Sequence, residues 1–203
     1  MSMAKLAQAA GALGLRLTPE QLAAFDRYAV ELAEWNRRFN LTAVAEYEEV
    51  QIRHFLESLL PLVALKKVGW APPTPAGRPL SARLCADVGS GAGFPGLPLK
   101  IVCPAWGLLL VESVGKKVQF LQHMVQLLGL SDVVVEQARA EDVGRQERHR
   151  EQYDLVVARA VAELSVLAEY TLPLVRLGGM AVLHKGSRAE SEVWEAEQAV
   201  RLL

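Results

Sequence analysis

One short segment, residues 86–96, constrains the fold of this chain more than any other. Its sequence is ADVGSGAGFPG, in which an acid is followed by four glycines. An apolar run precedes it at residues 83–86, and a second follows its proline at residues 97–102. Glycines let the backbone turn sharply and let a ligand approach without a Cβ in the way. The segment therefore predicts a strand, a ligand-binding turn and a helix whose first N–H groups face the ligand.

Two classes of nucleotide cofactor use such a loop. The spacing Gly91-x-Gly93-x-x-Gly96 matches the fingerprint of dinucleotide-binding proteins. The overlapping pattern Asp87-x-Gly89-x-Gly91-x-Gly93, with an acid at the strand end, has the form used for S-adenosylmethionine. A glycine pattern alone is weak evidence, so a purely structural turn is a third interpretation.

A carboxylate at the end of the next apolar run strengthens the cofactor interpretation. Residues 107–112 read GLLLVE, and Glu112 follows the glycines by about twenty residues. In both cofactor classes an acid at the end of the second strand chelates the ribose hydroxyls. A solvated acid at a strand end is the alternative. We favour a ribose ligand because the glycine loop and the acid occur together.

Composition limits the class of protein. The chain has 203 residues, of which 51% are hydrophobic, enough for one core. It has neither an apolar run of about 18 residues nor a leader sequence, so we expect a soluble, cytoplasmic protein without a membrane partner. The formal net charge of -1 argues against coating nucleic acid by bulk electrostatics. Cys85 and Cys103 lack metal-ligand spacing and are expected to be reduced core thiols, with no metal bound.

The first 80 residues differ from the rest. Thr18-Pro19-Glu20-Gln21 has a capping residue, a proline at the first helical position and a Gln that completes a capping box. It predicts a helix that continues to about Phe39, followed by a second helix over residues 46–65. A proline-rich loop at residues 69–77 then separates two regions. We expect an N-terminal helical region over residues 1–80 and an α/β domain over residues 81–203.

After residue 82, short apolar runs alternate with helical patterns. This alternation predicts an α/β fold with a parallel, Rossmann-like sheet covered by helices on both faces. The chain stops inside an amphipathic pattern, so we expect the C-terminal strands of the sheet to be missing. The predicted strands lie near residues 83–88, 107–112, 132–136, 153–158 and 179–184, and the predicted helices near residues 95–103, 115–128, 162–173 and 188–202.

Basic residues follow four of these predicted strands. They are Lys116, Arg139, Arg159 and Lys185. Ligands of parallel sheets bind at the carboxyl ends of the strands, which all lie at one edge. Loops are polar in any case, which accounts for each residue taken alone. Their convergence favours a polyanion that docks beside the cofactor.

Six motifs follow one another along the chain: residues 36–42 (NRRFNLT), 53–59 (RHFLESL), the glycine loop with 94–96, Glu112-Ser113 with 116–117 and 120–121, 139–141, and 159–161. In this order they resemble the RsmG family, also called glucose-inhibited division protein B. That family comprises bacterial small-subunit ribosomal RNA guanine-N7 methyltransferases. The resemblance extends from about Ala12 to the end of the chain. It implies a class I methyltransferase fold, which in this family continues with a strand pair that completes a seven-stranded sheet.

The resemblance also implies a cofactor, a partner and a set of site residues. The cofactor is S-adenosylmethionine, and the partner is small-subunit ribosomal RNA, naked or assembled with ribosomal protein. Ala140 and Glu141 match the segment along the adenine ring. The expected cofactor-binding residues are Asp87, Gly89, Gly91, Gly93, Phe94, Glu112, Ala140, Glu141 and Arg159. The expected catalytic residues around the substrate are Arg159, Arg139, Lys185, His54 and Lys116.

The implied chemistry needs no strong base. N7 of guanine carries a free lone pair and attacks a sulfonium methyl group without losing a proton, so alignment and desolvation carry the catalysis. Arg159 is expected to donate to the O6 edge of the base, an acceptor pattern that suits arginine. Lys116, Arg139 and Lys185 are expected to hold phosphates.

Three other functions stay open from the residues alone. A nicotinamide-dependent reductase fits the dinucleotide spacing, but the chain has no Tyr-x-x-x-Lys pair and no room for a second substrate domain. A small-molecule methyltransferase leaves the basic residues unexplained. A non-catalytic RNA-binding module is the third. Taken alone, His54 is a surface or capping histidine, and only the motif suggests more. We expect a monomer, because no spare apolar face is evident.

Overall fold

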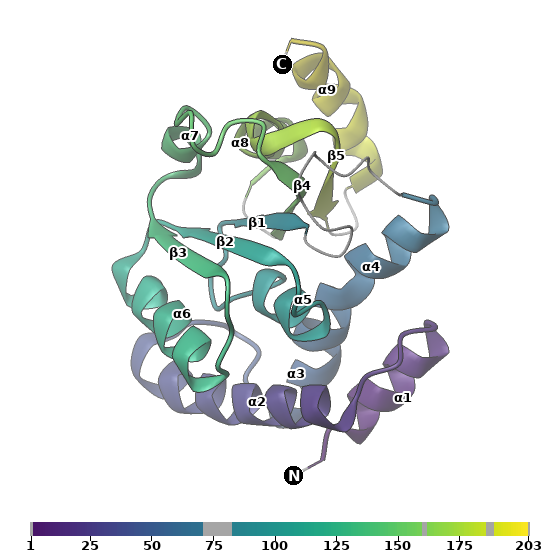
Figure 1. Ribbon diagram of the computed structural model, residues 1–203, viewed down its shortest axis with the longest axis vertical. Helices are drawn as coiled ribbons and strands as arrows, with labels where there is room; N and C mark the ends of the chain where they lie inside the picture. The colour runs from purple at the N-terminus through teal and green to yellow at the C-terminus, as the bar shows by residue number, and fades with distance from the viewer. Residues whose placement is uncertain (1, 71–82, 160–161, 186–188, 203) are drawn as a thin grey trace.

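A five-stranded parallel sheet forms the centre of the structure, a computed structural model that describes residues 2–70, 83–159, 162–185 and 189–202 (Figure 1). The strand order is β3-β2-β1-β4-β5, and every neighbouring pair is parallel. The order reverses between β1 and β4, which is where sheets of this kind bind ligands. The strands are β1 (Leu84–Val88), β2 (Gly107–Glu112), β3 (Val133–Gln137), β4 (Tyr153–Arg159) and β5 (Val175–His184).

The predicted Rossmann-like α/β sheet is confirmed. All five strands occur close to the predicted bounds, since each is an apolar run bounded by turn residues. One boundary is wrong: β5 begins at Val175 rather than near 179, because the strand continues through Gly178 and Gly179 with an irregular register opposite Tyr153 and Leu155. Among the described residues, no helix has the length and apolar character needed to cross a bilayer.

Helices cover both faces of the sheet, as predicted. α5 (Gly96–Val102) and α6 (Gly115–Leu127) lie on one face, and α7 (Ala140–Val143) and α8 (Leu164–Thr171) lie on the other (Figure 1). A short 3₁₀ turn follows α8, and α9 (Ala189–Leu202) packs against α8. Successive strand residues point to opposite faces and so enter two cores. Cys85, Leu108, Leu110, Leu155 and Val157 enter one, and Ala86, Val88, Leu109, Val111, Val156 and Ala158 enter the other.

The N-terminal helices pack on the same face as α5 and α6. α2 (Pro19–Phe39) begins with the predicted capping box at Thr18. The predicted helix over residues 46–65 is present as a continuous helical segment from Tyr47 to Lys67, but its middle, Gln51–Leu56, is π-helical rather than α-helical. Two helices, α1 (Ala4–Ala12) and α7, were not predicted. The elements around the π-helix are α3 (Tyr47–Val50) and α4 (Glu57–Lys67). The predicted boundary at residues 80–81, and the proline-rich loop beyond residue 70, lie outside the described residues.

Aromatic side chains join the N-terminal helices to the glycine loop. Tyr28 of α2 is fully buried, and its ring stacks on Phe94 with centroids 5.3 Å apart. Its hydroxyl donates a hydrogen bond to the carbonyl of Ala92 inside the loop. Phe25 and Phe55 pack beside it in the same core. The glycine loop is therefore supported by α2, whose Tyr28 lies 64 residues before Ala92.

We expect Tyr28→Phe to lower the free energy of unfolding by about 1 kcal/mol, because it leaves the Ala92 carbonyl without this donor. Urea denaturation measures the change. Tyr47→Phe is the matched control, since the Tyr47 hydroxyl donates to Asp26 at a half-buried position. Its effect should be smaller. Equal losses in the two variants would contradict a special role for the buried bond.

Candidate active site

Two adjacent pockets lie at the carboxyl ends of the strands. The first, of about 470 Å³, is called the strand pocket and is bounded by Glu112 and residues 138–141. The second, of about 670 Å³, is called the helix pocket and is bounded by Arg53, His54, Glu57 and His184. Gly89, Gly91 and Arg159 line both pockets. The two pockets therefore adjoin at the glycine loop and Arg159.

Asp87 supports the glycine loop through two hydrogen bonds. It is fully buried at the end of β1, and its Oδ2 accepts a hydrogen bond from the N–H of Gly96 at 2.9 Å. Its backbone carbonyl accepts another from the Ser90 hydroxyl at 3.0 Å. Burial raises the pKa of the Asp87 carboxyl to about 7. Because Asp87 lines neither pocket, it supports the loop rather than contacting a ligand there.

Glu112 ties the loop to β2. Its two carboxylate oxygens accept hydrogen bonds from the N–H groups of Gly91 and Val114, each at 2.8 Å. The residue is 5% exposed and lines the strand pocket. Each carboxylate oxygen can accept more than one hydrogen bond, so Glu112 keeps acceptor capacity for ribose hydroxyls. Gly89, Gly91, Glu112, Ala140 and Glu141, all predicted cofactor residues, line this one pocket.

Two other predicted cofactor residues lie elsewhere. Gly93 lines neither pocket, and a Cβ on it would meet Leu97 and Tyr28. Phe94 lines the helix pocket, and its ring stacks on the His54 ring with centroids 4.4 Å apart. Gly93 therefore allows close packing beneath the loop, and Phe94 supports the floor of the second pocket.

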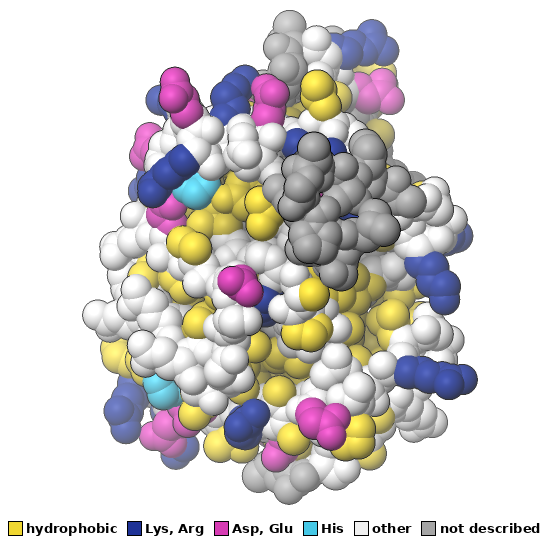
Figure 2. Space-filling view, in the orientation of Figure 1, with side chains coloured by type: hydrophobic (Ala, Val, Ile, Leu, Met, Phe, Trp, Pro, Cys, Tyr) yellow, Lys and Arg dark blue, Asp and Glu magenta, His cyan; other side chains and the backbone are white. Residues whose placement is uncertain are grey.

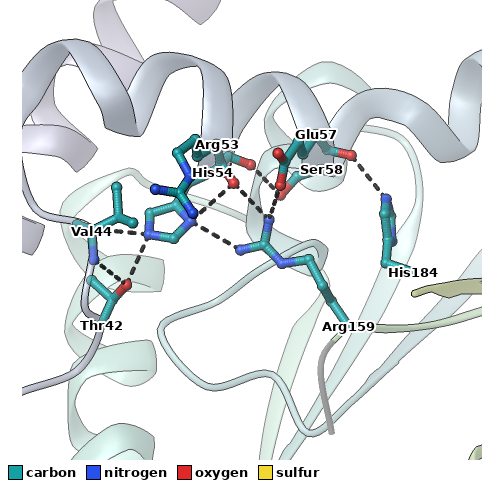
Figure 3. Close-up of polar contacts among 8 residues, drawn as sticks. All are labelled: Thr42, Val44, Arg53, His54, Glu57, Ser58, Arg159 and His184. Carbon is teal, nitrogen blue, oxygen red and sulfur yellow. Dashed lines mark hydrogen bonds and ion pairs between the residues drawn. The ribbon is translucent and has the colours of Figure 1, made fainter. Parts of the chain in front are cut away.

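Arg159 is the centre of a polar cluster in the helix pocket (Figure 3). Its guanidinium donates to the carbonyl of Arg53 and to Nδ1 of His54, each at 3.1 Å. The carboxylate of Glu57 lies 3.6 Å away, and the guanidinium carbon lies 5.1 Å from the centroid of the Phe94 ring. The side chain is 15% exposed. Arg159 is thus held in a single orientation at the border between the two pockets.

His54 acts on Arg159 as a neutral acceptor. Because Nδ1 faces the guanidinium, the ring proton belongs on Nε2, which lies 2.9 Å from the Thr42 hydroxyl and 3.1 Å from the carbonyl of Val44. Burial, followed by the charge of Arg159, lowers the pKa of His54 to about 4. Near neutral pH His54 therefore carries no positive charge, and its one ring proton faces Val44 and Thr42, so it serves as a positioning residue.

The lowered pKa of His54 predicts a pH dependence of stability. An unfolded histidine titrates near 6.5, so between about pH 6.5 and 4 the unfolded chain binds more protons than the folded one. Stability is then lost as the pH falls. In His54→Gln this contribution is absent, and we expect the loss between pH 7 and pH 5 to be smaller than in the parent chain by about 1 kcal/mol. Urea denaturation at the two pH values tests this; equal losses would contradict the assignment.

The predicted basic residues are distributed over different places. Lys185 lines the helix pocket, where its amine donates to the carbonyl of Ala162 and pairs with Glu192, each at 2.7 Å. Arg139 lines the strand pocket. Lys116 is exposed and lines neither pocket, whereas the next residue, Lys117, lines the strand pocket. The single basic edge expected from the strand ends is therefore divided between two pockets.

Sequence reasoning left several helix-pocket residues without a role. Arg53, Glu57 and Thr42 line this pocket together with His54. All three belong to the motifs at residues 36–42 and 53–59, so the sequence marked these segments as relevant. It did not show that Arg53 and Glu57 contact Arg159, which lies more than one hundred residues further along the chain.

The chain matches the family model GidB, described as rRNA small subunit methyltransferase G, over residues 21–203. A ribosomal RNA small subunit methyltransferase G from Roseiflexus castenholzii is 51% identical over 201 residues, covering 99% of this chain and 80% of the relative. The enzyme of that name from Bacillus cytotoxicus is 44% identical and covers 95% and 76%. A crystal structure of a Corynebacterium glutamicum protein is similar in fold, with a TM-score of 0.55 and 20% identity, covering 89% of this chain and 81% of that one.

Proposed function

Because the chain belongs to the rRNA small subunit methyltransferase G family, we propose that it methylates N7 of one guanine in small-subunit ribosomal RNA, with S-adenosylmethionine as methyl donor. The observation that carries the proposal is the pair of pockets joined at Gly89, Gly91 and Arg159. One pocket is suited to a nucleoside cofactor and the other to a base. Family membership sets aside the nicotinamide, small-molecule and non-catalytic alternatives.

The strand pocket fits S-adenosylmethionine. Gly89 and Gly91 present backbone to the pocket, Glu112 offers acceptors for the ribose, and Ala140 and Glu141 form the wall beside them. The bound cofactor supplies an electrophilic methyl group on a sulfonium centre. Asp87 and Tyr28 act indirectly, because both hold the loop rather than the ligand. We propose that Gly93 and Phe94 support the site in the same indirect way.

The helix pocket needs to align a guanine but not to deprotonate it. Arg159 is fixed by His54 and the Arg53 carbonyl, so its donors are oriented before the base arrives. Such preorganised donors act without reorganising during the reaction. A neutral His54 agrees with a reaction that removes no proton from the nucleophile. We propose that Arg159 donates to O6, which fixes the base while N7 stays free.

The distribution of charge points to a local RNA contact. On the face shown in Figure 2, Lys and Arg side chains lie mostly around the margin and alternate with acidic ones. With a net charge of -1, bulk attraction to RNA is weak. We propose that folded RNA, alone or with ribosomal protein, presents the guanine to a monomer in the cytoplasm. We propose that Arg139, which lines the strand pocket, and Lys185, which lines the helix pocket, contact RNA phosphates, with phosphate replacing Glu192 at Lys185.

Transfer of labelled methyl groups from S-adenosylmethionine to unmethylated small-subunit RNA tests the function. Naked and assembled RNA are compared, and the product is treated with borohydride and aniline, which cleaves at N7-methylguanine. Label with one discrete cleavage site is expected. Label without cleavage would move the reaction to another atom. Bound cofactor without label on either RNA would contradict an rRNA substrate.

A further inference from the structure

We propose that Glu57 recognises the guanine base and, together with Arg159, selects it against adenine. This inference rests on the proposed function, because it assigns the base specificity of the same pocket. Glu57 begins α4 at the end of the π-helix and lines the helix pocket. Of the described residues that line this pocket, it alone carries a carboxylate.

A carboxylate is unexpected at this place. The pocket faces a polyanion, and Arg53, Arg159 and Lys185 also line it. A negative charge among them repels RNA phosphates and weakens binding. The ion pair with Arg159 offsets part of this cost. Recognition of hydrogen-bond donors on a base would offset more of it, since an ionised carboxylate is an acceptor only.

Glu57 forms an ion pair with Arg159 but no hydrogen bond to it. The guanidinium already donates to the Arg53 carbonyl and to His54, and its separation of 3.6 Å from the Glu57 carboxylate exceeds a hydrogen bond. Within the described residues, the Glu57 carboxylate accepts no hydrogen bond, and its side chain is 47% exposed. The carboxylate therefore keeps its hydrogen-bond acceptor capacity for an incoming group.

The backbone around Glu57 is fixed, which gives the carboxylate a defined place. His184 at the end of β5 donates from Nε2 to the Glu57 carbonyl at 2.9 Å, and the Ser58 hydroxyl donates to the carbonyl of His54 (Figure 3). These contacts join the start of α4 to the sheet and to the π-helix. Glu57 is thus anchored beside Arg159 by its main chain while its side chain stays available.

Arg159 and Glu57 are complementary to the hydrogen-bonding groups at O6, N1 and N2 of guanine, but not to the corresponding groups of adenine. Guanine presents the O6 acceptor next to the N1–H and N2–H donors. Arg159 can donate to O6, and Glu57 can accept from the two donors, so both charged groups are satisfied and N7 stays free. Adenine reverses the order, with an amino donor toward the arginine and a lone pair toward the carboxylate. Sites that hydrogen-bond a substrate group reject analogues that leave such groups unpaired.

The experiment replaces the target guanine, located by the cleavage assay, with inosine, which keeps O6, N1–H and N7 but lacks the N2 amine. For the parent chain we expect kcat/KM on inosine RNA to be roughly 10- to 100-fold lower than on guanine RNA. Glu57→Gln should lower kcat/KM on guanine RNA by a similar factor and bring the ratio between the two RNAs toward one. Glu49→Gln, at an exposed acid of α3 outside both pockets, should keep the parent ratio.

Three results separate the explanations. A parent chain that methylates both RNAs equally would overturn the inference without any variant. A Glu57→Gln variant that slows both reactions and keeps the parent ratio would show that Glu57 acts only through Arg159, and would also overturn it. A parent chain that transfers no methyl group to guanine RNA would instead refute the proposed function. Cofactor affinity, measured separately, confirms that the variant is folded.

Discussion

Arg159→Ala is expected to lower kcat/KM for methyl transfer by roughly 10³-fold while changing the Kd for S-adenosylmethionine by less than about tenfold. Arg159 lines both pockets, but its hydrogen bonds and its ion pair all join it to the helix pocket. Its loss removes the oriented donors for the base and leaves Gly89, Gly91 and Glu112 in place for the cofactor. Single-turnover methyl transfer and equilibrium binding measure the two quantities separately.

Arg159→Lys is the informative second variant. Lysine keeps the positive charge but cannot donate at once to the Arg53 carbonyl, to His54 and to a base in the fixed plane of a guanidinium. We expect it to recover little of the lost rate. If Arg159→Lys restores most of the activity, charge rather than orientation is what the pocket supplies. If Arg159→Ala weakens cofactor binding as much as turnover, Arg159 belongs to the cofactor site instead.

The sequence predicted the parts of this site whose residues lie close together along the chain. The strand, the glycine turn and Glu112 follow one another within about thirty residues, and parallel strands bring their carboxyl ends together by topology alone. The five strands were predicted because short apolar runs flanked by turn residues are typical of buried strands. That Gly89, Gly91 and Glu112 line the strand pocket follows from these rules, whereas Ala140 and Glu141 were assigned to the cofactor through the family resemblance.

Other features depend on contacts that a sequence does not display. The π-helix at Gln51–Leu56 has no composition signal, yet it places His54 and the Arg53 carbonyl against Arg159. The sequence also did not show which of Lys116 and Lys117 lines the strand pocket. Successive residues on a helix are rotated by about 100°, so these two lysines face different surroundings. A motif that contains both lysines cannot decide between them.

Gly93 illustrates how the same residue type serves two purposes within one loop. The spacing placed it with Gly89 and Gly91 as a cofactor residue, but the direction of its absent Cβ depends on φ, which is +92°. That Cβ would point into the core beneath the loop. Sequence spacing shows where glycines are required, whereas the backbone angles show which of them make room for a ligand and which make room for the protein itself.

Gly93→Ala is therefore expected to destabilise the fold strongly, by about 4 kcal/mol in the free energy of unfolding. An alanine Cβ would lie within 2.5 Å of the Leu97 side chain and also overlap the Tyr28 hydroxyl. Neither neighbour can withdraw: both are fully buried, and Tyr28 is stacked on Phe94 and bonded to Ala92. The left-handed φ adds strain for any residue with a Cβ. Urea denaturation measures the loss, and S-adenosylmethionine binding should weaken with it.

Gly11→Ala is the matched control for the same chemical change. Gly11 lies in α1, exposed and with no atom within 4 Å of its added Cβ, and its φ is ordinary for a helix. Alanine is the better helix former, so this variant should gain about 0.5–1 kcal/mol. The two substitutions thus have opposite expected signs. If Gly93→Ala folds as stably as the parent chain and loses only cofactor affinity, Gly93 borders the ligand after all, and the packing contact with Tyr28 is not what requires glycine there.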